Sequence, residues 1–153
     1  MQTRLNSTHS HLYDRDYYLW LQTTLEQIKT GKLEQVDWVN LIAEIEDMSR
    51  RERKAIFSNL KILLMHLLKY QHQPEKRSNS WLFTILEHRQ RILEDLEISP
   101  SLGNYLVECY PKSYQNARKL TSVETGLSLS YFPELSPFTL EETLNPEYLP
   151  AGD

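Results

Sequence analysis

The chain contains one cysteine, four glycines and no long apolar run, and each shortage excludes a class of protein. A single cysteine, Cys109, leaves no disulfide framework and no cysteine-based metal site. The scattered glycines form no glycine-rich loop that would cradle a phosphate. No stretch approaches the roughly 18 apolar residues of a membrane-spanning helix, and the N-terminus lacks the apolar segment of a secretory signal. We therefore predict a cytoplasmic protein that does not enter a membrane.

The remaining composition is that of a globular domain, with 153 residues of which 40% are apolar and 25% are charged. This length favours one domain with a core of its own. The net charge of −4 is unevenly distributed, since residues 50–91 carry ten Lys or Arg against three Glu and the rest of the chain carries −11. The basic middle is compatible with an anionic ligand, or with acidic helices of the same fold or of a second copy. Overall acidity disfavours nucleic acid as a partner without excluding it.

The spacing of apolar residues predicts helices nearly throughout and no sheet. A first helix is expected between an N-cap at Asp14 and a stop at Gly31, and a second after an N-cap at Asp37. The stretch Ser49-Arg-Arg-Glu52 has the form of a capping box, which predicts that a third helix starts there. The apolar faces expected to be buried are Tyr17, Leu21, Leu25 and Ile28 in the first helix, Trp38, Leu41, Ile42, Ile45 and Met48 in the second, and Ile56, Phe57, Leu60, Leu63, Leu64, Leu67 and Leu68 in the third, central one.

A fourth helix is expected to begin near residues 78–80, with an inward face formed by Trp81, Leu82, Ile85, Ile92 and Leu96. Ser99 and Pro100 read as the N-cap and first residue of a further helix, which Pro111 is expected to interrupt. The predicted fold is all-α, a helical bundle of about five to six helices with an extended Pro-rich C-terminal strap. The predicted organisation is a flexible N-terminal arm at 1–12, the bundle at 13–125 and the strap at 126–153.

The segment that follows Thr125 holds four of the seven prolines and almost no helical period. Its many apolar side chains argue against a solvated linker, and its prolines reduce the entropy lost on ordering. We therefore expect the segment to pack on the bundle, with Phe132 and Phe138 docked between helices. The alternative is a flexible tail that binds a partner through the same aromatic rings.

Seven short segments stand out in the chain: Tyr13-Asp-Arg-Asp-Tyr-Tyr-Leu-Trp20, Asn40-Leu-Ile-Ala-Glu-Ile-Glu46, His66-Leu-Leu-Lys69, Gln73-Pro-Glu-Lys-Arg-Ser-Asn-Ser-Trp81, Ser99-Pro-Ser-Leu102, Glu124-Thr-Gly-Leu127 and Phe132-Pro-Glu134. In this order and at these spacings, they resemble a family of small helical bacterial proteins catalogued as a domain of unknown function, number twenty-nine. The resemblance extends from Tyr13 to Pro150. It implies an all-helical fold and carries no activity with it. The family tends to show two adjacent acids where this chain has Ala43 before Glu44, so a role that needs both is not expected.

Two seams of polar residues run along the predicted second and third helices and supply the candidate site. If these helices face each other, carboxylates, an imidazole and a guanidinium converge, a set that supports acid–base chemistry or holds an anion. The alternative is a buried polar network that fixes helix register, in which His66 bonds to Glu44 or Glu46 and Arg77 pairs with an acid. The candidate binding residues are Glu44, Glu46, His66, Gln73 and Arg77.

No metal and no cofactor are predicted, because no helix places a second ligand at Glu-x-x-His or His-x-x-x-His spacing. Cys109 has no His at a motif spacing, and no Gly-x-Ser-x-Gly elbow occurs. Our leading hypothesis is therefore a protein-interaction or self-associating module without catalysis, most simply a homo-oligomer. The alternative is a hydrolytic or nucleic-acid-processing enzyme that uses the polar Glu/His/Arg cluster.

Overall fold

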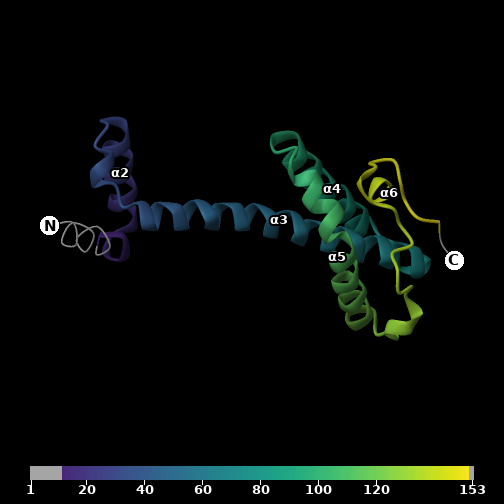
Figure 1. Cartoon of the computed structure of the whole chain (residues 1–153). Helices are drawn as coiled ribbons and strands as arrows, with labels where there is room; N and C mark the ends of the chain where they lie inside the picture. The colour runs from purple at the N-terminus through teal and green to yellow at the C-terminus, as the bar shows by residue number, and fades with distance from the viewer. Residues whose placement is uncertain (1–11, 152–153) are drawn as a thin grey trace. The chain divides into compact units, whose positions relative to one another are not determined.

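The structure is a computed structural model, which describes residues 12–151 (Figure 1). All regular structure in this range is helical, which confirms the all-α prediction. The predicted arm, residues 1–12, lies outside the described residues except for residue 12. The chain divides into two compact units, residues 1–50 and 51–153. The elements are α2 (Tyr17–Lys29), η1 (Leu33–Gln35), α3 (Trp38–His72), η2 (Pro74–Lys76), α4 (Asn79–Ile98), α5 (Leu102–Thr125), η3 (Leu129–Tyr131) and α6 (Leu140–Leu144), preceded by a helical turn at residues 12–15.

The ends of α2 and the start of α3 follow local capping chemistry. The side chain of Asp16, not of Asp14 as predicted, caps α2 by accepting the Leu19 N–H at 3.0 Å. Gly31 follows the end of α2 with φ +75°, a left-handed conformation that glycine adopts without strain. Asp37 caps α3 as predicted, because its carboxylate accepts the Asn40 N–H at 3.3 Å.

Helix α3 is continuous over 35 residues, so the predicted start of a third helix at Ser49 is wrong. The capping-box signature is overridden because its surroundings favour helix. No Gly or Pro interrupts residues 38–72, and the stretch after Ser49 consists of Arg, Glu, Lys and Ala. Arg50 also pairs with Asp47 one turn earlier, across the predicted break.

The first unit buries a different face of its helices from the one predicted. Trp20, Thr24 and Gln27 of α2 are buried, whereas the predicted faces of α2 and of the start of α3 are exposed apart from the half-buried Leu41. Polar contacts set this rotation, since the Trp20 indole N–H donates to Asp37 at 3.3 Å and the Tyr17 hydroxyl donates to Glu44 at 2.8 Å.

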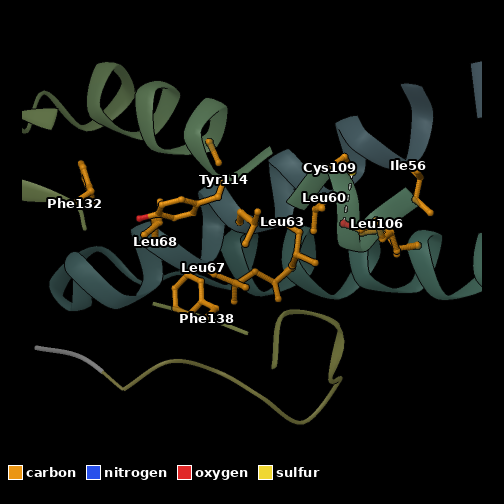
Figure 2. Close-up of a cluster of buried hydrophobic side chains, with 14 of the residues drawn as sticks. Ile56, Leu60, Leu63, Leu67, Leu68, Leu106, Cys109, Tyr114, Phe132 and Phe138 are labelled. Atoms are coloured by element: carbon orange, nitrogen blue, oxygen red, sulfur yellow. Dashed lines mark hydrogen bonds between the residues drawn. The ribbon is translucent and has the colours of Figure 1, made fainter. Parts of the chain in front are cut away.

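The second unit is built around the C-terminal half of α3, as the sequence predicts. Its wide aliphatic face is buried together with residues of α4, α5 and the C-terminal segment (Figure 2). A stripe of this width needs neighbours on more than one side, which explains why this half of α3 is central. The side chains of α3 in the cluster are Ile56, Leu60, Leu63, Leu64, Leu67 and Leu68, with Phe57 partly buried against them.

The ends of α4 and α5 show where local signals succeed and fail. Helix α4 begins within the predicted range, and Ser78 caps it by accepting the Trp81 N–H at 3.3 Å. Ser99 and Pro100 instead form a turn, and α5 begins at Leu102, whose N–H donates to the Ser99 carbonyl at 3.0 Å. On α4, Ile85 and Ile92 are buried as predicted and Trp81 and Leu96 are half-buried, whereas Leu82 is exposed.

Pro111 lies inside α5 and does not interrupt it, which contradicts the prediction. A proline inside a helix leaves the carbonyl four residues earlier without its donor, at a cost of about 3 kcal/mol. That carbonyl belongs to Val107, an exposed residue, so water can serve as its donor. Buried residues on both sides of the proline hold the helix together, with Leu106 before it and Tyr114 and Ala117 after it.

The C-terminal segment contributes two aromatic rings to this core, as predicted for those residues. Phe132 and Phe138 are 1% and 3% exposed and belong to the buried cluster (Figure 2). Thr139 and Glu142 form a reciprocal capping box at the start of α6. Side chains of α5 also bind backbone carbonyls of the segment, through Tyr114 to Pro133 at 2.5 Å, Arg118 to Phe132 at 3.0 Å and Tyr110 to Phe138 at 2.7 Å.

Candidate functional site

The first unit holds a buried carboxylate, Glu44 of α3, between two tyrosines. The hydroxyls of Tyr13 and Tyr17 donate to its two oxygens, the second at 2.8 Å. The bond to the Glu44 carboxylate is the main reason why the pKa of Tyr13 rises to about 12. The two tyrosine rings also pack with Trp20, Tyr13 edge-on at 4.9 Å and Tyr17 stacked at 5.9 Å. The network therefore fixes α2 and the preceding turn to α3.

The other acids of this unit are divided between structural bonds and the solvent. Asp37 accepts the Asn40 side-chain amide at 2.7 Å in addition to its capping bond, and Asp47 pairs with Arg50. Glu46 is exposed. The first polar seam thus serves to attach α2 and to begin α3.

In the second unit, Lys69 of α3 joins three helices. Its side chain is largely buried, and Nζ lies 2.8 Å from Glu124 Oε1 at the end of α5. The same ammonium lies 4.6 Å from the centre of the Trp81 ring on α4. An ion pair combined with a cation–π contact compensates a buried lysine. The three residues come from three of the family-like sequence segments.

Two histidines lie in this region with the same hydrogen-bonding pattern. His66 Nδ1 lies 2.9 Å from the Ile62 carbonyl, and His88 Nδ1 lies 2.8 Å from the Thr84 carbonyl. Because a carbonyl only accepts, Nδ1 carries the hydrogen in both rings and Nε2 is the acceptor of the neutral form. Burial lowers the pKa of His66, with smaller contributions in the same direction from Lys69 and His88, so the ring is neutral at pH 7.

The five predicted site residues lie on α3 and in the turn that follows it. Glu44 and Glu46 lie on the same continuous helix as His66, so the hairpin that would bring the two seams face to face is not formed. The ring nitrogen of His66 bonds the Ile62 carbonyl, and Gln73 is buried where α3 gives way to η2. Within residues 12–151, no three His, Cys, Asp or Glu side chains are grouped to hold a metal. A functional site formed by these five residues stays a prediction.

Arg77 is held in place by an aromatic residue, and within residues 12–151 no acid pairs with it, contrary to the prediction. Its Nε donates to the Tyr70 carbonyl at 2.8 Å. Its Cζ lies 4.0 Å from the centre of the Tyr70 ring, so the guanidinium is stacked on that ring. The arginine therefore ties the turn after α3 to the last turns of the helix.

Replacing Arg77 with lysine is expected to lower the free energy of unfolding by about 1–3 kcal/mol. The planar guanidinium stacks on the Tyr70 ring and donates to the Tyr70 carbonyl at the same time, whereas the compact ammonium of lysine cannot do both. Urea denaturation followed by circular dichroism measures the change. Arg51→Lys, an exposed arginine of α3, is the matched control and should change stability by less than about 0.5 kcal/mol. Equal stability of Arg77→Lys and the control would show that the stacked contact is not stabilising.

Two buried residues of α4 that take part in polar contacts were not among the predicted site residues. His88 and Arg89 are both buried, and Arg89 donates from Nε to the Thr143 carbonyl at 2.9 Å. Arg89 lies between Ile85 and Ile92 on the apolar face of the helix. This position in the sequence could have identified it as a buried arginine. A charged residue at core spacing requires a partner that sequence spacing does not identify.

Fold and site together define an all-helical protein whose buried charges are engaged mainly in joining helices. The chain belongs to the family described as Domain of unknown function DUF29, whose model matches residues 12–149. No curated protein matches the chain, and no solved structure does. Among residues 12–151, no helix is both long enough and apolar enough to cross a membrane.

Proposed function

We propose that the chain is a self-associating protein-interaction module whose first unit binds a second copy of itself. The observation that carries the proposal is the surface of that unit. Among its described residues, 12–50, it buries two large apolar side chains, Trp20 and Val36, and exposes twelve. An excess of exposed over buried apolar side chains favours an interaction surface on a folded protein. The exposed residues are Tyr17, Tyr18, Leu19, Leu21, Leu25, Ile28, Leu33, Trp38, Val39, Ile42, Ile45 and Met48.

The spacing of these residues supports a helical partner. On α2 the exposed positions Tyr17, Leu21, Leu25 and Ile28 recur every three or four residues, and the start of α3 repeats the pattern. Such stripes are the faces that helices bury against other helices in bundles. Trp20 and Glu44 do not contribute to these faces, because both form hydrogen bonds within the unit.

A second copy is the simplest occupant, because it presents the same two stripes. In a two-fold arrangement each stripe packs against the same stripe of the other copy, so a single apolar surface is buried on both copies. Two helices from each copy would together enclose a four-helix core, which neither first unit has alone. Burial of the two stripes of each copy supplies the apolar area on which stable dimers depend.

The test is the substitution Ile45→Glu, studied by sedimentation equilibrium across a range of concentrations. Ile45 is 58% exposed, so a glutamate there leaves the fold of the single chain intact. We expect the unaltered chain to have the mass of a dimer or a larger oligomer. Ile45→Glu should shift it to a monomer with unchanged helicity, since a charge in an apolar interface is strongly unfavourable.

Val123→Glu is the matched control, because Val123 is an apolar residue on α5 that is 83% exposed and belongs to the second unit. It should keep the oligomeric mass of the unaltered chain. A monomer at every concentration of the unaltered chain would contradict the proposal, and the stripes would then be covered within the chain or by another protein. An oligomer dissociated equally by both substitutions would place the interface elsewhere.

A further inference from the structure

A small cavity of about 160 Å³ lies between α4 and the end of the C-terminal segment. Its lining is apolar except for one residue, Arg89. The cavity is well below the roughly 300 Å³ at which pockets for drug-sized ligands begin, so it does not fit a nucleotide or a folded peptide. The lining residues are Leu82, Ile85, Leu86, Arg89, Pro146 and Leu149.

Arg89 is 2% exposed and is poorly compensated for a buried cation. Of its five N–H groups, one makes a hydrogen bond among the described residues, from Nε to the Thr143 carbonyl at 2.9 Å. Nη2 is buried and has no partner within residues 12–151, and no carboxylate in that range pairs with the guanidinium. Burial lowers the pKa of Arg89, which reflects the same lack of a counter-charge.

The nearby acid on α6 does not supply that counter-charge. Glu142 accepts the Thr139 N–H at 3.1 Å within the capping box of α6. Tyr148 does not supply it either, because a tyrosine hydroxyl ordinarily ionises near pH 10 and burial raises the pKa of this one further. A buried guanidinium with one neutral acceptor is an unfavourable arrangement unless an anion completes it.

We infer that Arg89 and this cavity form a binding site for a small monocarboxylate with a short apolar tail. The planar guanidinium matches a carboxylate in shape and donates two parallel hydrogen bonds to it. The tail would lie among Leu82, Leu86 and Leu149, which line the cavity. The site is independent of the proposed oligomer, since its residues belong to the second unit.

The probe is sodium hexanoate, added to the full chain while thermal unfolding is followed by circular dichroism. A ligand that binds the folded state raises the melting temperature progressively with its concentration. We expect hexanoate to raise it, and hexanamide and sodium chloride at the same concentrations to leave it unchanged. An equal rise with hexanamide would overturn the inference, because the cavity would then bind apolar chains without using Arg89. No rise with hexanoate would also overturn it.

Two variants locate the response. Arg89→Met removes the charge and should weaken hexanoate binding by about tenfold or more, the effect of losing a charge-assisted hydrogen bond. Because that variant also loses the bond to Thr143, Leu86→Trp keeps Arg89 and fills the cavity from its exposed rim. It should fold and lose the response. An unchanged response in Leu86→Trp would place hexanoate outside the cavity and contradict the inference, whatever the oligomeric state.

Discussion

Replacing Phe138 with alanine is expected to lower the free energy of unfolding by about 3–5 kcal/mol, the usual range for removing a buried aromatic ring. The ring is 3% exposed and lies in the same cluster as the leucines of α3 (Figure 2). Urea denaturation measures the loss. Leu135→Ala provides the control in the same segment, because Leu135 is 82% exposed and its replacement should change stability by less than about 0.5 kcal/mol.

Removal of the whole segment after Thr125 extends the same prediction. The shortened chain loses the rings of Phe132 and Phe138 and the carbonyls that Tyr110, Tyr114 and Arg118 bind. We expect a lower melting temperature and less helix, since α3 and α5 would each expose part of their buried faces. Unchanged melting and helicity would show that the segment lies outside the cooperative fold, and its aromatic residues would then be candidates for binding a partner.

The tyrosines of α5 illustrate how the segment is held. Tyr114 is almost fully buried, and burial is the main reason why its pKa rises to about 12. Its hydroxyl remains a donor at neutral pH and binds the Pro133 carbonyl at 2.5 Å. Tyr110 does the same for the Phe138 carbonyl at 2.7 Å. Outside η3 and α6, backbone carbonyls of the segment are thus bound by side chains of α5.

Local signals in the sequence predicted what depends on neighbouring residues. The aliphatic stripe on α3 from Ile56 onward identified the central helix, and the predicted cap at Asp37 and the predicted start of α4 near residues 78–80 are correct. The helix start predicted from the capping-box sequence at Ser49 is wrong because the same residues also fit a helix interior. Local sequence rules do not decide between a helix start and a helix interior for these residues. Loss of that one boundary placed both polar seams on a single helix, so the predicted hairpin between them is not formed.

Contacts between distant segments could not be predicted from spacing. Lys69 was visible as a polar residue on an apolar helix, but its partner Glu124 lies 55 residues away. In the first unit, periodicity identified the apolar stripes of α2 correctly and their burial incorrectly. Apolar spacing shows that a face must be covered, but not whether the cover belongs to the same chain. That distinction is the basis of the proposed self-association.

Replacing Glu124 with alanine is expected to lower the free energy of unfolding by about 1.5–3 kcal/mol, because it leaves the buried ammonium of Lys69 without its counter-charge. Glu124 is half exposed, so water screens part of the effect and the loss stays below the 3–5 kcal/mol typical of fully buried pairs. Glu108→Ala, an exposed acid on the same helix, is the control and should change stability by less than about 0.5 kcal/mol.

Lys69→Met separates two contributions to the effect of Glu124→Ala. One is the penalty of leaving the buried Lys69 ammonium unpaired, and the other is the loss of attraction within the ion pair. Methionine keeps an apolar stem of similar length beside Trp81 and removes the ammonium, so this variant should be destabilised less than Glu124→Ala. The double variant should have nearly the same free energy of unfolding as Lys69→Met alone, because without the ammonium the loss of Glu124 leaves no unpaired buried charge. Urea denaturation of the four chains completes the cycle. A loss for Glu124→Ala no larger than that for Glu108→Ala would show that Lys69 is solvated, and the joining of α3 to α5 would then rest on apolar packing alone.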